Sequence, residues 1–206
     1  SNLKPSCVVI VATIRALKMH GGILKDELKN ENVSALKKGL VNLERHINNT
    51  RKFGLPVTIA VNHFITDSEK EMKTLLNFCK TQGVKASKCT HWSNGSEGTK
   101  ELAKNVVEIC EDNQDTFKYL YENKLPLFKK IEKIAQEIYH AKEVVADTKI
   151  RKQLKDFEEK GYGELPVCIA KTQYSFSTDP NLKGAPTGHV LPVREVRLSS
   201  GAEFIV

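Results

Sequence analysis

Several features that would place a sequence in a specialised class are absent from this one. No apolar run approaches the roughly 18–20 residues of a membrane-spanning helix, and no secretory signal opens the chain, so we expect a cytoplasmic protein without a membrane partner. Aromatic residues are only 7% of the chain, and we find no nucleic-acid-recognition motif. The phosphate-binding pattern G-x-x-x-x-G-K-[ST] is also missing, so these 206 residues contain no P-loop.

Cysteine is present in a number and an arrangement that argue against two kinds of site. The five cysteines are odd in number, scattered and mostly flanked by apolar residues, so we expect reduced, buried thiols and no disulfide framework. Cys89 and His91 could form one ligand pair, but no second pair follows at zinc-like spacing. We therefore expect no metal site.

The remaining composition is that of an ordinary globular protein. The chain has 206 residues, 40% of them hydrophobic, which suffices for one large domain or two small ones. Its net charge of +7 comes from lysines, for which solvated helix faces are the simplest interpretation. The same charge could attract an anionic small ligand. A basic nucleic-acid-binding protein stays open as an alternative, although we expect no nucleic-acid partner.

The first half of the chain alternates between strand-like and helix-like segments. In order these are strand 7–13, helix 31–51, strand 56–62, a helix opened by the capping box of Ser68 and Glu71, strand 84–89, and a helix ending near residue 110. The first two strands are apolar and β-branched, so we expect them to be buried on both faces. This order predicts a parallel sheet in a three-layer α/β architecture of the Rossmann-like or P-loop-NTPase-like kind.

The second half is less regular and predicts a smaller α+β part. Its expected segments are a helix beginning near Pro126, a helix capped by Asp147, strand 165–170, an exposed loop over 178–188, and strand 189–198. We expect a boundary between residues 1–115 and 116–206. The abrupt start and the strand-like end at residue 206 suggest a fragment of a larger subunit, incomplete at its C-terminus.

Three expected loops leave the carboxyl ends of the strands, where parallel α/β proteins bind ligands. They cover residues 14–22, 62–67 and 90–98. The first is basic and ends in glycines, which let backbone approach a ligand closely. Residues that we expect at the edge of a site are His20, Gly21, Gly22, Asn62 and, from a polar segment after a later strand, Lys171. For His20, Arg15 and Lys18, ordinary loop residues without a ligand are the simpler interpretation.

Phe64 and Trp92 form the sharpest pair of candidates. Each follows a histidine on a loop that leaves an expected strand. Two facing aromatic rings make a slot for a flat heterocycle, and each stacking face contributes roughly 1–3 kcal/mol by analogy with base stacking. The alternative is that each ring packs beneath its own loop.

These motifs together resemble one family, formate–tetrahydrofolate ligase, also called 10-formyltetrahydrofolate synthetase. The resemblance rests on ALKMHGG at 16–22, on Phe64 and Trp92 in their contexts, and on three longer segments: ENVSALKKGLVNLERHI at 31–47, LPLFKKIEKIAQEIYHA at 125–141 and LPVCIAKTQYSFSTDP at 165–180. The chain is most similar to bacterial single-function members. The resemblance implies that the pterin ring of tetrahydrofolate stacks between Phe64 and Trp92.

The resemblance also implies a reaction and its cofactors. Family members join formate to tetrahydrofolate through formyl phosphate, use ATP with Mg²⁺, respond to a monovalent cation and are commonly homotetramers. Because the P-loop that activates formate is absent here, we expect this fragment to hold part of the folate slot and to be inactive alone. A stand-alone α/β ligand-binding module that was never part of an enzyme is the alternative.

The sequence departs from the family pattern at two glycine-rich places. Gly95-Ser96 stands where paired glycines are usual, and Glu203 stands where the family favours glycine. A glutamate can crowd a loop that needs a positive φ. The resemblance therefore leaves the ligand role of that loop open.

Overall fold

The structure is a computed structural model that describes residues 4–112 and 116–206. The described residues form two compact units. The α/β unit comprises Lys4–Lys118 and Lys183–Ala185, and the second unit comprises Tyr119–Leu182 and Pro186–Val206. The expected boundary after residue 115 falls at the edge of a segment outside the described residues.

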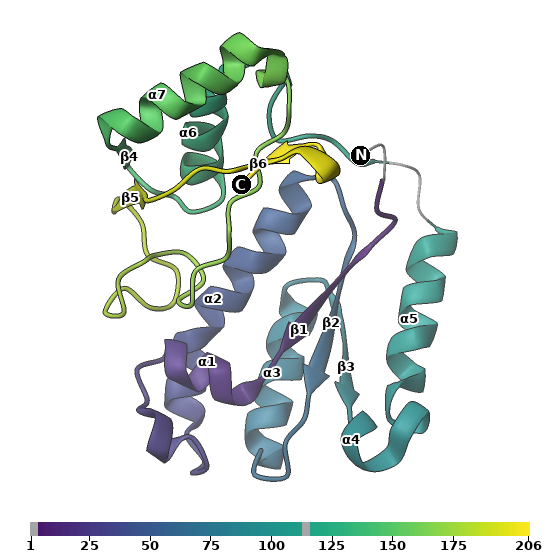
Figure 1. Cartoon of the computed structure of the whole chain (residues 1–206). Helices are drawn as coiled ribbons and strands as arrows, with labels where there is room; N and C mark the ends of the chain where they lie inside the picture. The colour runs from purple at the N-terminus through teal and green to yellow at the C-terminus, as the bar shows by residue number, and fades with distance from the viewer. Residues whose placement is uncertain (1–3, 113–115) are drawn as a thin grey trace. The chain divides into compact units, whose positions relative to one another are not determined.

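The α/β unit contains three parallel strands that alternate with helices (Figure 1). In chain order its elements are β1 (Val8–Ala12), α1 (Ile14–His20), the 3₁₀ turn η1 (Lys25–Glu27), α2 (Val33–Lys52), β2 (Val57–Asn62), α3 (Glu69–Thr81), β3 (Lys85–Cys89), α4 (His91–Asn94), the 3₁₀ segment η2 (Gly95–Thr99) and α5 (Lys100–Glu111). The sheet order is β1-β2-β3, and both strand pairs are parallel. The predicted α/β class and parallel sheet are confirmed.

The strand register shows which helices cover each face of the sheet. Ile59 and Val61 of β2 belong to the core shared with α2 and α3. The alternate residue Ala60 lies beside Ser87 of β3, whose Oγ accepts a 2.8 Å hydrogen bond from Asn105 Nδ2 of α5. α5 therefore covers the opposite face, and the sheet is the middle of three layers.

β1 is less buried than its sequence predicts. Val9 is 38% exposed and Val11 is 66% exposed. Both lie on the α5 side of the sheet, since they pair with Thr58 and Ala60 of β2. α5 packs on β2 and β3, so within the described residues that side of β1 stays open. Burial on both faces is wrong for β1 and confirmed for β2.

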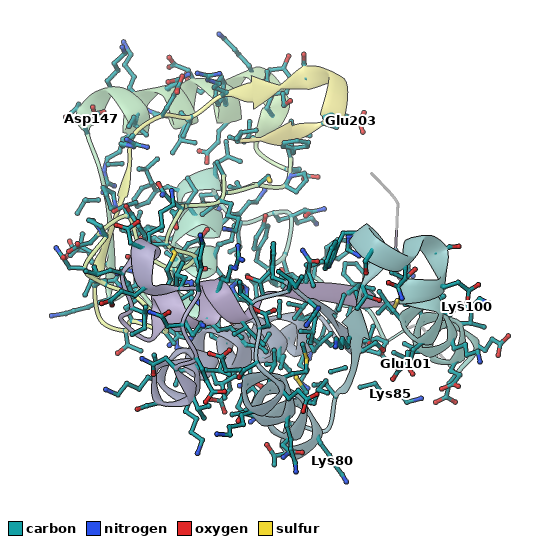
Figure 2. The ribbon with its side chains drawn as sticks, turned by 90° about the horizontal axis from the view of Figure 1, so that it is seen from below. Lys80, Lys85, Lys100, Glu101, Asp147 and Glu203 are labelled. Carbon is teal, nitrogen blue, oxygen red and sulfur yellow. The ribbon has the colours of Figure 1, made fainter. Side chains whose placement is uncertain are left out.

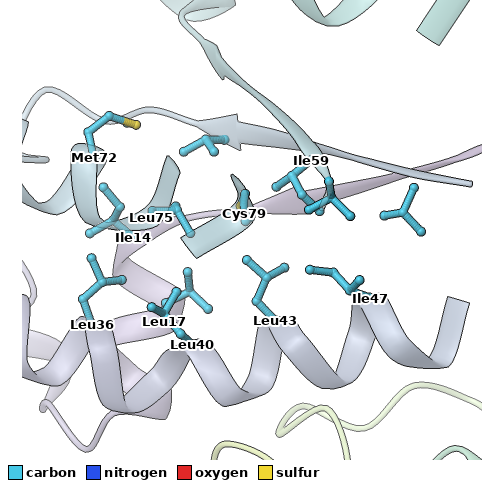
Figure 3. Close-up of a cluster of buried hydrophobic side chains, with 14 residues drawn as sticks. Ile14, Leu17, Leu36, Leu40, Leu43, Ile47, Ile59, Met72, Leu75 and Cys79 are labelled. Carbon is cyan, nitrogen blue, oxygen red and sulfur yellow. The ribbon is translucent and has the colours of Figure 1, made fainter. Parts of the chain in front are cut away.

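The core of the α/β unit lies between the sheet and its α2–α3 face (Figure 3). The predicted apolar stripe of α2 is confirmed by the burial of Leu36, Leu40, Leu43 and Ile47. α3 begins at the predicted capping box, in which Ser68 Oγ accepts from the N3 backbone N–H and the N3 carboxylate accepts from the Ser68 N–H. Each fully buried aliphatic side chain contributes about 1.5–3 kcal/mol.

The stretch expected as a basic loop after β1 is the helix α1. Thr13 begins it, because its Oγ1 accepts a 3.1 Å hydrogen bond from the Ala16 N–H. The backbones of α1 and α2 are in direct contact where the two helices pack. A Cβ at Gly21 would overlap the Ala35 carbonyl, and a Cβ at Gly39 would overlap the Leu17 carbonyl. Gly21 therefore serves helix packing in this structure.

Lys18 is fully buried and not a solvated loop residue. Its Nζ lies 2.9 Å from Glu71 Oε1 and donates a 2.8 Å hydrogen bond to the Asn30 carbonyl. Glu71 also accepts from the N–H groups of Asn32 (2.8 Å) and Ser68 (3.1 Å). The capping-box glutamate thus joins α1, the start of α2 and the start of α3.

The second unit combines helices with two short two-stranded sheets (Figure 1). Its elements are α6 (Leu127–Glu137), β4 (Glu143–Ala146), α7 (Thr148–Phe157), the π-helical turn η3 (Glu158–Tyr162), β5 (Val190–Val193), β6 (Leu198–Ser199), the 3₁₀ turn η4 (Ser200–Ala202) and β7 (Phe204–Ile205). β4 pairs with β5 in parallel, and β6 pairs with β7 antiparallel. Asp147 caps α7 as predicted, accepting 2.7 Å from the Ile150 N–H. The strand expected over 189–198 is divided into β5 and β6.

The strand expected over 165–170 is not formed. Only Val167 makes an isolated bridge, to Ile205. The Val167 N–H donates to the Tyr121 hydroxyl (2.8 Å), which donates in turn to the Val167 carbonyl (3.2 Å). Because Pro166 has no N–H and a side chain takes the hydrogen bonds of Val167, the segment is extended without a strand ladder.

The three lysines labelled in Figure 2 support the solvated interpretation of the charge. Lys80, Lys85 and Lys100 are exposed and extend away from the ribbon. Lys130, like Lys18, is fully buried; its Nζ donates to the carbonyls of Gly163 (2.7 Å) and Leu165 (2.8 Å). Burial lowers the pKa of Lys130, against the opposing charges of two nearby glutamates.

The cysteines are less uniformly buried than expected. Cys79 and Cys89 are buried, Cys7 is half-buried, and Cys110 and Cys168 are exposed. The prediction of burial from apolar neighbours in the sequence is therefore confirmed for Cys79 and Cys89 and wrong for Cys110 and Cys168. Separately, none of the helices formed by residues 4–112 and 116–206 has the length and apolar character needed to cross a membrane.

We expect Glu71→Gln to lower the free energy of unfolding by about 3–5 kcal/mol, because it leaves the Lys18 ammonium buried without a carboxylate. Burial raises the pKa of Glu71, but hydrogen bonds from Asn32, Lys18 and Ser68 outweigh it, and the net pKa lies below the usual 4.5. The stabilisation is therefore complete above about pH 4.5 and disappears as pH falls through the folded pKa.

Urea denaturation followed by Trp92 fluorescence, repeated between pH 3 and 7, measures this. The matched control is Glu137→Gln, which removes a half-exposed i,i+4 ion pair with Lys133 and should change stability by less than about 0.5 kcal/mol. Equal effects of the two substitutions would contradict a dominant role for the buried pair.

A second prediction concerns Glu203, which adopts a left-handed conformation with φ 57° and ψ 45°. That conformation costs a non-glycine residue about 1 kcal/mol. We expect Glu203→Gly to raise the free energy of unfolding by roughly 0.5–1 kcal/mol, as measured by chemical denaturation. Glu143→Gly, in β4 and outside the positive-φ residues, is the control and should lower stability. A loss of stability in Glu203→Gly would show that its side chain outweighs the backbone strain.

Candidate functional site

The carboxyl ends of β2 and β3 bring the two candidate aromatic residues to one rim. The His63 N–H donates a 3.1 Å hydrogen bond to the Cys89 carbonyl, so the ladder continues one residue past β2. Trp92 lies in α4 directly after β3, and its indole Nε1–H donates 2.8 Å to the His63 carbonyl. The indole is thus hydrogen-bonded to the residue that precedes Phe64. Trp92 remains 55% exposed, so its ring is accessible to a ligand.

Phe64 is held by a closed turn. Its N–H donates 2.8 Å to Asp67 Oδ2, and the Asp67 N–H donates 2.9 Å to the Phe64 carbonyl. The guanidinium of Arg15 lies 4.2 Å from the centre of the Phe64 ring, in cation–π geometry. Arg15 Nη2 also donates 3.0 Å to Thr66 Oγ1. The start of α1 and the β2–α3 loop therefore build one side of the rim together.

Three buried polar atoms around Phe64 have no hydrogen-bond partner among the described residues. They are Arg15 Nε, His63 Nδ1 and Asp67 Oδ1. A buried polar atom without a partner costs about 1–3 kcal/mol, so such atoms are uncommon and call for an explanation. One donor, one carboxylate acceptor and one imidazole nitrogen in the same loop cluster are suited to a ligand that carries both donors and acceptors.

A cavity of about 370 Å³ opens beside this cluster, between α3 and β3. Its lining includes His63, Asp67, Lys73 and Lys88. Burial lowers the pKa of His63, the charge of Lys88 lowers it further, and Asp67 partly opposes both. The lowered pKa favours the neutral imidazole, which offers one donor and one acceptor nitrogen.

The remaining predicted residues occupy different places. Asn62 ends β2 and shares the rim with Phe64 and Trp92. His20 ends α1, where its Nδ1 accepts a 3.1 Å hydrogen bond from the Gly184 N–H. It lies about 8 Å along the helix axis from Arg15.

Gly22 and Lys171 complete the set of predicted edge residues. Gly22 has a φ of 99° and open space where a Cβ would lie; it follows Gly21, whose packing role is described above. Lys171 belongs to the second unit, where its Nζ donates 3.3 Å to the Thr172 carbonyl. The structure therefore gathers Asn62, Phe64 and Trp92, and does not place Gly21 in a ligand-facing loop.

Sequence reasoning did not assign a role to Asp67 or to His63. A signal existed for Asp67, since an aspartate just before a capping box is a residue that can close the preceding turn. For Arg15 the sequence indicated at most a positive charge near the site, because its approach to Phe64 depends on α1 being a helix.

The chain is similar over its whole length to proteins of one family. The family profile described as formate–tetrahydrofolate ligase matches residues 1–206. A formate–tetrahydrofolate ligase of Pelagibacter ubique (strain HTCC1062) is 75% identical over the whole chain, and those of Ruegeria sp. (strain TM1040) and Sinorhizobium fredii (strain NBRC 101917 / NGR234) are 57% and 53% identical. The chain spans 37% of the length of each of these three relatives.

Proposed function

Since the chain belongs to the formate–tetrahydrofolate ligase family, we propose that its Phe64–Trp92 rim is the tetrahydrofolate slot of the whole enzyme. The whole enzyme joins formate to N10 of tetrahydrofolate with consumption of ATP. The observation that carries the proposal is that β2 and β3 deliver Phe64 and Trp92 to one rim, beside three unpartnered buried polar atoms.

The slot would recognise both the faces and the edge of a pterin. The two aromatic rings supply stacking surfaces. The 2-amino-4-oxopyrimidine edge of a pterin presents two N–H donors and a carbonyl acceptor. Asp67 Oδ1 suits the donors, and Arg15 Nε–H suits the carbonyl, because neither atom has a hydrogen-bond partner among the described residues.

Orientation is the contribution that such a slot makes to catalysis. N10 is an aniline-like nitrogen and a weak nucleophile, so its attack on the carbonyl carbon of formyl phosphate depends on alignment. N10 forms the new bond to carbon, phosphate leaves, and N10 loses its proton. A pterin held by Phe64, Trp92 and Asp67 leaves N10 at a defined distance from the slot.

The phosphate-handling groups belong to the rest of the subunit in this proposal. No P-loop sequence occurs in the 206 residues. Formate and Mg²⁺-bound ATP would give formyl phosphate and ADP there. A monovalent cation would assist, and the whole enzyme would assemble as a homotetramer. Lys171, His20 and Gly22 are the positions of this chain that we propose at the edge of that larger site.

In the whole enzyme, we expect Phe64→Ala or Trp92→Ala to raise the KM for tetrahydrofolate about tenfold or more, because each removes one stacking face. The KM for ATP should stay within twofold. Steady-state assays with each substrate varied in turn measure both constants. Ile65→Ala is the matched control, since Ile65 lies on the same loop and is 81% exposed. An unchanged KM for tetrahydrofolate in both variants would overturn the slot assignment.

Asp67→Asn sharpens the same experiment. Asparagine keeps an oxygen that can cap the Phe64 N–H and loses the charge that faces the pterin edge. We expect a weaker affinity for tetrahydrofolate but little change for an analogue that lacks the 2-amino group. An equal loss for both ligands would show that Asp67 acts only through the loop.

We also expect no ATP-dependent formation of 10-formyltetrahydrofolate by the 206-residue chain alone. A coupled assay that converts the product to 5,10-methenyltetrahydrofolate and follows its absorbance tests this. Turnover that scales with the concentration of the pure chain would refute the division of labour proposed above.

A further inference from the structure

Two cysteines that are distant in the sequence meet at the amino-terminal edge of the α/β unit. The Sγ atoms of Cys7 and Cys110 lie 3.8 Å apart, although 103 positions separate them. Cys7 directly precedes β1, and Cys110 lies in the last turn of α5. The contact joins the start of β1 to the end of α5, the helix that covers the face of the sheet opposite α2 and α3.

We propose that Cys7 and Cys110 are a disulfide-forming pair, oxidised reversibly by small-molecule disulfides. Two sulfurs at 3.8 Å are in van der Waals contact, and a disulfide bond of ~2.05 Å requires them to approach by about 1.8 Å. The remaining cysteines are placed differently. Cys79 and Cys89 are buried, and Cys168 lies exposed in the second unit.

The exposure of the two thiols assigns their order of reaction. The Cys110 thiolate is exposed and attacks one sulfur of the small disulfide, forming a mixed disulfide and releasing one thiol. Cys7, half-buried beside it, then loses its proton and attacks the Cys110 sulfur, which releases the second thiol. The protein loses two electrons and two protons, and the small disulfide gains both.

The environment of Cys7 makes it the thiol that reacts second, by attacking the mixed disulfide on Cys110. Burial raises its pKa, and the neighbouring Cys110 raises it further. The thiolate is the reactive form, so ring closure should accelerate as pH rises above 7. An exposed thiol that reacts first and a sheltered thiol that resolves it give an intramolecular disulfide in preference to a lasting mixed one.

The pair lies at the end of the unit opposite the Phe64–Trp92 rim. In a parallel β-α fold the helices run back toward the amino ends of the strands, and Figure 1 shows the end of α5 and the start of β1 at the same edge. The disulfide would therefore restrain the fold without entering the rim. This inference does not depend on the proposed function.

The test uses the 206-residue chain, incubated with excess oxidised glutathione at pH 8 and then blocked with N-ethylmaleimide. We expect peptide mass spectrometry to find Cys7 joined to Cys110 and Cys168 carrying at most glutathione. The oxidised protein should remain monomeric on a non-reducing gel, and its Tm should rise by about 5 °C or more, because the crosslink closes a long loop. Dithiothreitol should reverse both changes.

Three variants provide the controls. Cys7→Ser should accumulate the mixed disulfide of Cys110 with glutathione, because the resolving thiol is missing. Cys110→Ser should leave Cys7 reduced, and Cys168→Ser should behave like the parent chain. The proposal is overturned if the parent chain and Cys7→Ser give the same Cys110–glutathione adduct, or if Cys110 crosslinks mainly between molecules.

Discussion

The buried ion pair of Lys18 and Glu71 is the interaction on which the α/β unit depends. Two charges removed from water are costly, and the cost is offset only when their hydrogen bonds are complete. Here Glu71 accepts from Lys18 and from two backbone N–H groups, at Asn32 and Ser68. The pair therefore fixes the position of α1 relative to the starts of α2 and α3.

That constraint reaches the candidate site because the same elements carry it. α1 presents Arg15 to the Phe64 ring, and the turn that holds Phe64 runs directly into the capping box at Ser68. The rim is thus built on a rigid base. Its unsatisfied atoms, Arg15 Nε and Asp67 Oδ1, are held in place with hydrogen-bonding capacity unused. Rigid positioning with unused capacity is what a preorganised binding site requires.

Features coded by near neighbours in the sequence could be predicted, and features set by distant contacts could not. The capping box at Ser68 and the cap at Asp147 are complete within four residues, and both are present. One face of β1 is exposed because α5 packs on β2 and β3, which are distant from β1 in the sequence. The loss of strand 165–170 depends on Tyr121, more than forty residues away.

The candidate site divides in the same way. Asn62, Phe64 and Trp92 could be gathered from topology alone, because parallel strands end at a common edge. Arg15 and Lys18 could not be placed while α1 was taken as a loop. Once Thr13 caps a helix, one side of α1 turns Lys18 inward and its start brings Arg15 to the ring.

The contact between α1 and α2 has a consequence for variation in this chain. Gly21 and Gly39 set the spacing of the two helices through backbone atoms, with no side chain that could adjust. A single methyl group at either position would push α1 outward and carry Arg15 with it. Two positions outside the rim would then alter its shape. The shape of the rim therefore depends on two residues that have no side chains.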